Sequence, residues 1–486
     1  MNARASLLVA LLAPLASRAQ TAAESCRPAT GDARVVLAHA GHVLGLDATQ
    51  GRILKMRSYE ITQHNYESDR PYRPYITFVA DHLSWLDLAT GIERDSSLSE
   101  FGAFGRASLV VIGDDHATFA ARDTTWRQSD AAWLNAEHFR ALDPRIVVRT
   151  WRAATDVRVA ERCTFRDYER TVLTRSGPYG PERLYVDPHT DYVAKLDRQE
   201  SHYLWGQVHV EFLYATWLLY GMINMPTTST ELVDGDEQVA RTVVAADWIP
   251  RDSSPSLALP APATPATVAL PRFLLPTPLD TERLGAHTFL LANPGYNEIV
   301  TLVRDTVYVL DATQSESRAR ADSAWIGRLF PGRHPITVIV TDLAWPHVSG
   351  VRFWVASGAT IVSRPQSAPF LRAVVARHWT RAPDKLESTH PRATLRFVPA
   401  HAHVGIVPYA IDGVASEGAL MVWLPADSLL WASDYVQSLD APTQYVTEVY
   451  AATCRVSITP TRVVAQHQPT APWSKLSALV TTGCGR

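Results

Sequence analysis

The chain has 486 residues and a mass of 53.7 kDa, which exceeds the size at which one hydrophobic core usually stops growing. We therefore expect two domains. The formal net charge of −3 gives no overall electrostatic reason to expect nucleic acid as a partner, and 46% hydrophobic with 20% charged residues is typical of a folded protein.

The first residues have the pattern of an export signal. Arg4 supplies a positive start, residues 6–15 are mostly apolar, and a small-x-small cleavage site ends at Ala19. We predict a signal peptide at residues 1–19 and a periplasmic or extracellular location. No later stretch reaches the roughly 20 apolar residues of a membrane helix, so we predict no transmembrane segment.

A proline-rich segment at 251–280 divides the rest of the chain, because proline fixes φ and favours extended geometry. The predicted domains are therefore residues 20–250 and 281–486. Oligomeric state cannot be read from the sequence.

The N-terminal part is predicted to be a mainly antiparallel β domain. A helix at 33–46 comes first, since its apolar residues repeat at helical spacing. Strands follow from β-branched and aromatic runs at 109–112, 145–148, 183–186 and 192–196. Residues 187–191 favour a hairpin turn, and the aromatic stretch 203–220 puts large apolar side chains on one sheet face.

This layout, a leading helix and a curved sheet, resembles the half-barrels of outer-membrane lipoprotein carrier proteins, which shelter acyl chains. The resemblance implies a cleft for an apolar ligand, and a packed core is the alternative. One hypothesis for function is accordingly a cell-envelope assembly factor that recognises lipid through this sheet.

The C-terminal part is predicted to be α/β. Short apolar strands are expected at 299–303, 306–310, 336–340 and 359–362. A helix is expected at 317–330, where Pro331 and Gly332 end it. Strands that alternate with helices indicate a layered arrangement.

Several phrases of this half follow one another in a recognisable order. They are VLDAT (309–313), FPGRHPI (330–336), GATIV (358–362), SEGAL (416–420) and LPAD (424–427). In order and spacing they resemble the metallo-β-lactamase fold, which implies an αββα sandwich with zinc held by loops at one sheet edge.

The zinc ligands of that family are only partly present. Its Thr-His-x-His-x-Asp-His motif reads TDLAWPH at 341–347, so Asp342 and Ala344 replace two histidines, Pro346 replaces the aspartate and His347 remains. A further histidine is replaced by Ala415. The bridging aspartate and the last histidine match Asp434 and His467.

The resemblance thus implies that the first zinc site is absent and that His347, Asp434 and His467, with Asp342 as a fourth group, are the candidate metal ligands. Three ligands and a water could hold one zinc, which lowers the pKa of bound water for hydrolysis. Alternatively, these residues are remnants that bond one another. His401 and His403 could be a replacement ligand pair, although exposed histidines are the simpler interpretation.

We therefore expect either no cofactor or a single zinc ion. The favoured prediction is an exported metallo-β-lactamase-like protein with a depleted zinc site that is non-catalytic or weakly active and binds a small or apolar ligand. The alternative is an active mononuclear zinc hydrolase of esters, lactams or lactones. No Gly-x-Ser-x-Gly sequence points to serine chemistry.

Four cysteines fit an exported protein, because disulfides persist in oxidising compartments and the number is even. Cys454 and Cys484, which flank the last predicted strand and helix, are the preferred pair, and Cys26 and Cys163 are left over. Unpaired, buried cysteines are the alternative, since connectivity cannot be read from sequence.

Overall fold

The computed structural model describes residues 24–48, 51–64, 75–101, 104–114, 116–119, 124–127, 131–177, 180–202, 204–220, 223–258, 278–293, 295–381, 383–389, 395–400, 405–413, 418–481 and 484. The predicted signal peptide, most of the predicted linker and the pair His401 and His403 lie outside these residues. The domain boundaries drawn from the prolines remain a prediction.

The first half of the chain forms one large antiparallel sheet, as predicted. Its order, β1-β8-β9-β10-β11-β12-β13-β14-β2-β3-β4-β5-β6-β7, joins two meanders where β14 pairs with β2. The strands are β1 (Ser25–Pro28), β2 (Arg52–His64), β3 (Ile76–Asp87), β4 (Ile92–Phe101), β5 (Phe104–Ile112), β6 (His116–Phe119), β7 (Thr124–Arg127), β8 (Arg158–Phe165), β9 (Tyr168–Gly177), β10 (Gly180–Val186), β11 (Val193–His202), β12 (Gly206–Tyr220), β13 (Ile223–Val233) and β14 (Asp236–Pro250).

The described helices of this half are α1 (Ala33–Val43), α2 (Ala131–Ala141) and α3 (Pro144–Ala153). The prediction of a strand at 145–148 is wrong, because α3 occupies that segment. Asp143 caps α3 by accepting a hydrogen bond from the backbone N–H of Arg145, and Pro144 suits the first turn. Val147 and Trp151, four residues apart, share its buried face.

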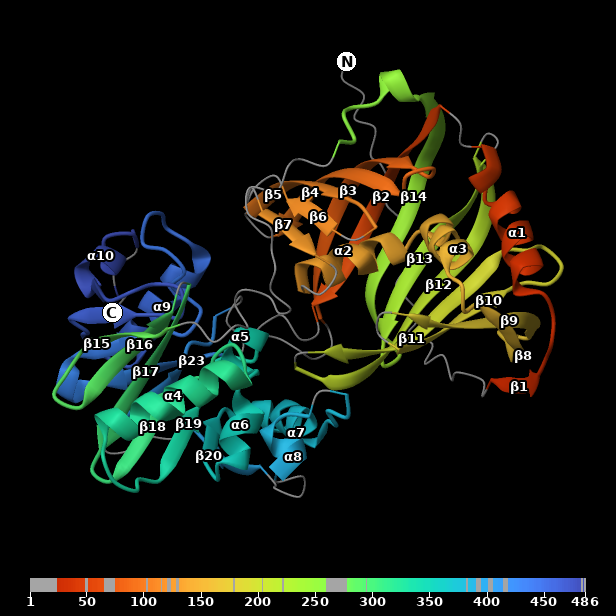
Figure 1. Ribbon diagram of the computed structural model, residues 1–486. Helices are drawn as coiled ribbons and strands as arrows, with labels where there is room; N and C mark the ends of the chain where they lie inside the picture. Colours follow the sequence, from red (N-terminus) through yellow and green to blue (C-terminus); the bar gives the residue numbers. More distant parts are fainter. Residues whose placement is uncertain are drawn as a thin grey trace, which may run out of the picture.

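The helices α2 and α3 lie in the hollow of the curved sheet (Figure 1). One apolar cluster joins α1 and α3 to the middle strands and includes Leu37, Trp151 and Phe212. In this region the aromatic stripe on the sheet is therefore packed core. Around α2 the buried side chains are charged instead, since His138 contacts Glu200 and Glu231 at 2.9 and 2.8 Å.

The second half contains two sheets. In the first, β15 (Asp280–Arg283), β16 (Thr288–Asn293), β17 (Tyr296–Val303) and β18 (Thr306–Leu310) are antiparallel, and β19 (Ile336–Ile339), β20 (Thr360–Ser363) and β21 (Arg396–Pro399) continue parallel to β18. The second comprises β22 (Val407–Ala410), β23 (Leu420–Leu424), β24 (Leu429–Trp431), β25 (Arg462–Val464) and β26 (Ala471–Pro472), of which β24 and β25 are parallel. The predicted strands at 299–303, 306–310, 336–340 and 359–362 correspond to β17 to β20.

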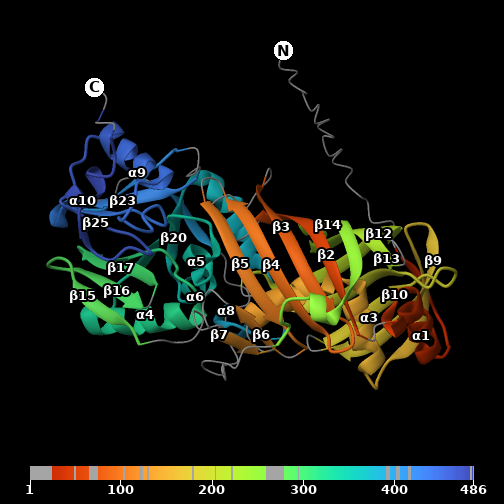
Figure 2. The same cartoon turned by 90° about the horizontal axis from the view of Figure 1, so that it is seen from above.

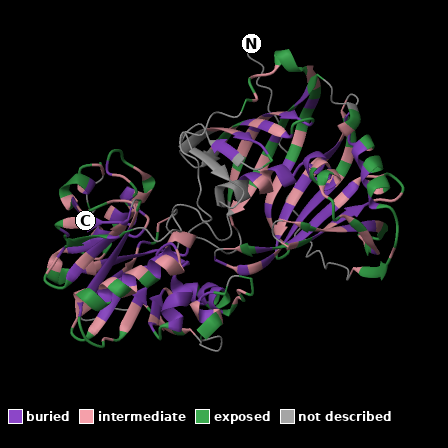
Figure 3. Cartoon of the chain, viewed as in Figure 1, coloured by how far each residue is buried: buried purple, intermediate pink, exposed green. Residues whose placement is uncertain are grey.

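Apolar clusters arrange this half in layers. The helices are α4 (Glu316–Leu329), α5 (Trp345–Val348), α6 (Val351–Ala356), α7 (Ala368–Ala376), α8 (Lys385–Thr389), α9 (Gln444–Arg455) and α10 (Trp473–Ser477). Helices α4, α6 and α7 pack on the first sheet, and α9 and α10 pack on the second. Between the sheets, Leu310 and Trp431 belong to one shared cluster, and buried residues run along the strands of this half (Figure 3).

The two halves lie next to each other (Figure 2). They touch through the turn between β11 and β12. The Trp205 ring meets Phe370 of α7 edge-on at 5.3 Å. Arg377 donates from Nε to the carbonyl oxygen of Trp205 at 2.6 Å. Gly206, with φ of +65°, leaves no space for a Cβ, which would lie 2.4 Å from the carbonyl oxygen of His378.

All four cysteines are paired. Cys454 bonds to Cys484, as preferred from the sequence, and Cys26 on β1 bonds to Cys163, directly opposite on β8. Two disulfides are consistent with a non-cytoplasmic protein. Among the described residues, no helix combines the length and apolar character that crossing a membrane requires.

Candidate functional site

The four predicted ligand residues lie at the ends of strands in the second half. Asp342 and His347 follow β19, the latter within α5. Asp434 follows β24 and His467 follows β25. Because β19 and β18 are parallel, as are β24 and β25, these residues are presented at the carboxyl ends of paired strands. That edge is where α/β folds commonly place binding sites.

His347 is held by a residue that the sequence did not single out, Asp311. The His347 Nδ1 atom lies 2.8 Å from Asp311 Oδ2, and both residues are fully buried. The same carboxylate accepts hydrogen bonds from the backbone N–H of Thr341 at 2.7 Å and from its hydroxyl at 2.8 Å. Asp311 therefore fixes the loop after β19 as well as the imidazole.

The charge on His347 follows from its surroundings. Burial alone would lower its pKa, but the carboxylates of Asp311, Asp342 and Asp434 outweigh burial and raise the pKa to about 9. The imidazole is thus charged at neutral pH in this arrangement. Its Nε2 atom is buried and makes no hydrogen bond with any residue that the structure describes.

Asp342, the fourth candidate ligand of the sequence prediction, has partners on both oxygens. Oδ1 accepts from the backbone N–H of Ala344 at 2.7 Å, and Oδ2 accepts from the Tyr435 hydroxyl at 3.1 Å. Burial, chiefly, raises the pKa of this carboxyl, while His347 works in the opposite direction. Asp342 is 2% exposed, so solvent barely reaches it.

Asp434 and His467 form a separate pair nearer the surface. His467 Nε2 lies 3.0 Å from Asp434 Oδ1, with side-chain exposures of 28% and 20%. The other ring nitrogen, Nδ1, donates to the carbonyl oxygen of Gly295 at 2.6 Å. A carbonyl oxygen only accepts, so Nδ1 carries a proton.

The residues of the site do not fit a zinc shell as they stand. No three of the described histidines, cysteines, aspartates and glutamates in this half bring ligand atoms within 4.8 Å of one another. Zinc needs three or four donors at about 2.0–2.3 Å. Ala344 and Pro346 have no donor side chain, and Ala415 lies outside the described residues.

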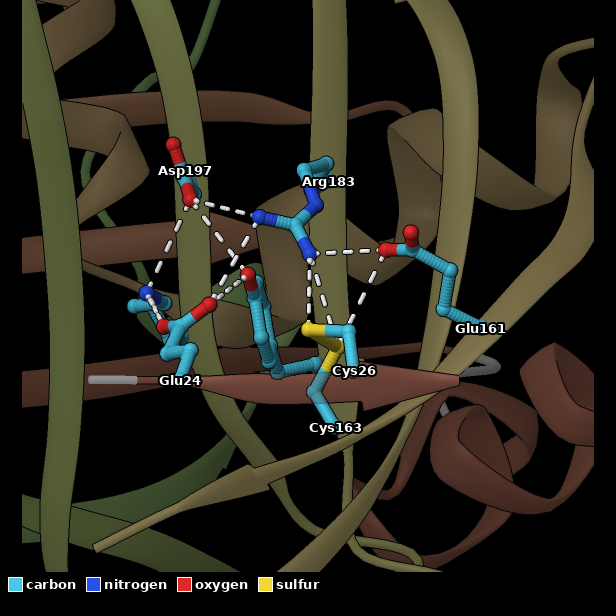
Figure 4. Close-up of a disulfide and its surroundings, with 8 residues drawn as sticks. Glu24, Cys26, Glu161, Cys163, Arg183 and Asp197 are labelled. Atoms are coloured by element: carbon cyan, nitrogen blue, oxygen red, sulfur yellow. Dashed lines mark hydrogen bonds and ion pairs between the residues drawn. A yellow bond between two sulfur atoms is a disulfide. The ribbon is translucent and has the colours of Figure 1, made fainter. Parts of the chain in front are cut away.

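A three-residue group with suitable spacing occurs elsewhere, at Glu24, Cys26 and Cys163. Figure 4 shows that its two sulfur atoms are joined in the disulfide, with Arg183 and Glu161 beside them. Sulfurs bonded to each other are not thiolates, and thiolates are the form that binds metal. This group is therefore structural.

Sequence reasoning missed two residues that define the site, Asp311 and Tyr435. Asp311 stands inside the VLDAT phrase, directly after β18, and has a φ of +79° that is unusual for a residue with a side chain. Tyr435 adjoins Asp434. Asp311 lies in a motif phrase and Tyr435 lies next to a predicted ligand, but only the fold shows which residues they contact.

No family model and no curated protein matches the chain. Among solved structures, the DIM-1 metallo-β-lactamase matches 41% of this chain and 94% of its own length, with 14% identity and a TM-score of 0.33. Metallo-β-lactamases from Pontibacter korlensis and Erythrobacter litoralis also match 41% of this chain, and 96% and 93% of theirs, with 16% and 11% identity and TM-scores of 0.32. The similarity is one of fold and concerns part of the chain.

Proposed function

We propose that this chain is an exported protein whose second half is an αββα sandwich of the metallo-β-lactamase kind, and that it binds a small ligand instead of hydrolysing one. The motif phrases of the sequence support the fold assignment. The role assigned to the site rests on one observation: among the described residues, the candidate ligands lie in separate pairs and no three of their ligand atoms converge on one point.

Three contacts make this point. Asp342 accepts from Tyr435, and His347 contacts Asp311 through Nδ1, so that only its buried Nε2 is without a hydrogen bond among the described residues. His467 pairs with Asp434. A hydrolytic zinc needs neutral imidazoles and an open position for water. We therefore propose that these three contacts stabilise the edge of the sheet and that catalysis is absent or weak.

Zinc content and hydrolysis measured together test this proposal. After zinc loading and desalting, we expect less than about a tenth of an equivalent of zinc per chain, because functional zinc sites bind far more tightly than that. We expect no hydrolysis of ester, lactam or lactone substrates.

Two variants give the test its control. His467→Ala removes a candidate ligand, and His189→Ala removes an exposed histidine in the turn between β10 and β11. Stoichiometric zinc and hydrolysis that disappear in His467→Ala but persist in His189→Ala would establish the mononuclear hydrolase and overturn the proposal.

Export is tested separately. Secretion of the full-length chain in a bacterial host should yield a mature protein that begins near Gln20, as read by intact mass. An uncleaved product retained in the cytoplasm would remove this part of the proposal.

A further inference from the structure

Helix α2 is attached to the inner face of the large sheet by charged side chains (Figure 1). Glu137 accepts two hydrogen bonds from the Arg198 guanidinium of β11, at 2.8 and 2.6 Å. Arg140 donates to Asp114, which follows β5, at 3.0 Å. His138 lies between these two contacts in the sequence and meets two further carboxylates, so it attaches α2 to the middle of the sheet.

The imidazole of His138 lies between carboxylates from two strands that do not pair with each other. Its Nδ1 lies 2.8 Å from Glu231 Oε1 on β13, and its Nε2 lies 2.9 Å from Glu200 Oε2 on β11. Strand β12 runs between these strands, and its Phe212 ring meets the imidazole edge-on at 5.6 Å. An ionised carboxylate only accepts hydrogen bonds, so both contacts are hydrogen bonds only when both ring nitrogens carry protons. The arrangement therefore requires the charged imidazolium.

Two other titratable groups of β11 face this site, and neither takes over the proton. Arg198 also donates to Glu200. Burial raises the pKa of Glu200, but Arg198 and His138 outweigh burial and lower it to about 2, so this carboxylate is ionised at neutral and alkaline pH. Burial lowers the pKa of His202 to about 3, and its Nδ1 accepts from two backbone N–H groups of the following turn. His202 is therefore neutral over the same range.

The pKa of His138 follows from the same contacts. Burial alone would lower it, but Glu200 and Glu231 outweigh burial and hold the pKa well above its usual value of 6.5. The side chain is 21% exposed, so solvent can exchange its proton. The attached helix binds this proton more tightly than a detached one would. The stabilising contribution is therefore complete below about pH 6.5 and is lost as the pH rises from there through the raised pKa.

Loss of the proton weakens the attachment of α2. A neutral imidazole has one N–H group, so either Glu200 or Glu231 loses its donor. Of the charged groups that face one another here, the carboxylates of Glu137, Glu200 and Glu231 then share the single positive charge of Arg198. Glu137 and Arg140 also line a cavity of about 280 Å³ between α2 and α3, so a displacement of α2 would open this cavity.

We propose that His138 is a proton-dependent attachment point for α2: the charged imidazolium holds the helix against β11 and β13, and the helix detaches locally when the imidazole is neutral. Helix α2 is then a pH-controlled cover for the inner face of the sheet. The inference goes beyond the proposed function, because it concerns the first half of the chain and involves neither zinc nor the candidate ligand residues.

Hydrogen exchange of the full chain, read by mass spectrometry of a peptide that covers residues 136–141, measures how often α2 opens. Parent and variants are compared at each pH from about 6 to 10, so that base catalysis of exchange cancels. Glu231→Gln is the first variant. Its amide can donate to Nδ1 while Nε2–H donates to Glu200, so a neutral His138 satisfies both contacts. The ratio of α2 exchange in the parent to that in Glu231→Gln should rise at least about tenfold across this range, because a lost hydrogen bond to a charged group corresponds to about that factor.

His138→Gln gives the converse comparison, since it carries no charge at any pH. At pH 6 its α2 peptide should exchange at least about tenfold faster than that of the parent, and the difference should shrink toward pH 10. His189→Ala, in the turn between β10 and β11, is the matched control and should follow the parent at every pH. Helix α4 of the second half is the internal reference and should exchange equally in all chains.

The proposal is overturned if the parent and Glu231→Gln show the same dependence on pH, or if His138→Gln protects α2 as well as the parent does at pH 6. Melting curves show that each variant is folded before exchange is measured. If His138→Gln does not fold, the Glu231→Gln profile decides. If neither variant folds, the parent decides, since its α2 exchange relative to α4 must still rise at least about tenfold with pH.

Discussion

Glu93 on β4 offers the sharpest test of the electrostatics of the large sheet. It is 2% exposed, and burial raises its pKa from about 4.5 to about 7. Arg241 of β14 and Arg140 of α2 oppose this rise, whereas Asp95 and Asp143 add to it. The folded chain therefore holds this proton more tightly than the unfolded chain. Its contribution to stability is complete below pH 4.5 and is lost as the pH rises through 7.

The size of the effect follows from the two pKa values. At about 1.4 kcal/mol for each tenfold change in proton affinity, ionised Glu93 costs about 3 kcal/mol at pH 8 and less than about 1 kcal/mol at pH 5. Glu93→Gln preserves shape and removes the charge. We expect the variant to exceed the parent in free energy of unfolding by about 3 kcal/mol at pH 8 and by little at pH 5.

Urea denaturation followed by tryptophan fluorescence at the two pH values measures this difference. Subtracting parent from variant cancels the other titrating groups, which are common to both chains. Glu282→Gln, exposed on β15, is the control and should stay within about 0.5 kcal/mol of the parent at either pH. The reasoning is refuted if Glu93→Gln and the parent are equally stable at pH 8.

Three further substitutions test the packing. Gly206→Ala should lower the melting temperature more than Gly235→Ala, because both have positive φ but only Gly206 faces a backbone oxygen; calorimetry that ranks them in the opposite order contradicts the contact between the halves. Cys454→Ser removes the disulfide between two residues that are 30 positions apart. By chain entropy this should lower the free energy of unfolding by about 4 kcal/mol, measured by denaturation, and an unchanged midpoint would count against the disulfide. Tyr435→Phe leaves one Asp342 oxygen without its donor and should cost about 1–3 kcal/mol, so a gain in stability would exclude that bond.

The sequence predicted the second half better than the first for a physical reason. Strands such as β18 and β19 are short apolar runs, and α4 begins at the capping residue Ser315 and ends before Pro331. These signals are local. In the first half, no strand was predicted before residue 109, although β2, β3 and β4 lie there.

Those strands were missed because part of their buried face is polar. Leu54 and Met56 on β2 are buried and apolar, but Ser58, His82 and Asp95 also point inward, so the alternation of hydrophobic with polar residues does not continue along the strands. The error at 145–148 has a different cause. Val147 and Val148 suggested a strand by composition, whereas the Asp143–Pro144 start signal of α3 was the stronger indication.

The candidate site was only half predictable for a related reason. Comparison with a ligand motif identifies Asp342, His347, Asp434 and His467, but it says nothing of the groups that bond to them. Asp311 and His347 are 36 residues apart, and Tyr435 and Asp342 are 93 apart. Such pairs are set by strand order, which no local pattern contains.

These partners decide what zinc would encounter at the site. Each carboxylate oxygen has two acceptor lone pairs, so Asp342 could bind a metal and still accept from Tyr435 and Ala344. The obstacle is the missing shell. A complete shell of donors returns about 10–16 kcal/mol in structural zinc sites, whereas no three donors among the described residues of this half lie within 4.8 Å of one another. Because the donors form pairs and not a shell, we expect a much smaller return here, and the Asp342 carboxylate and the Tyr435 hydroxyl satisfy each other without a metal.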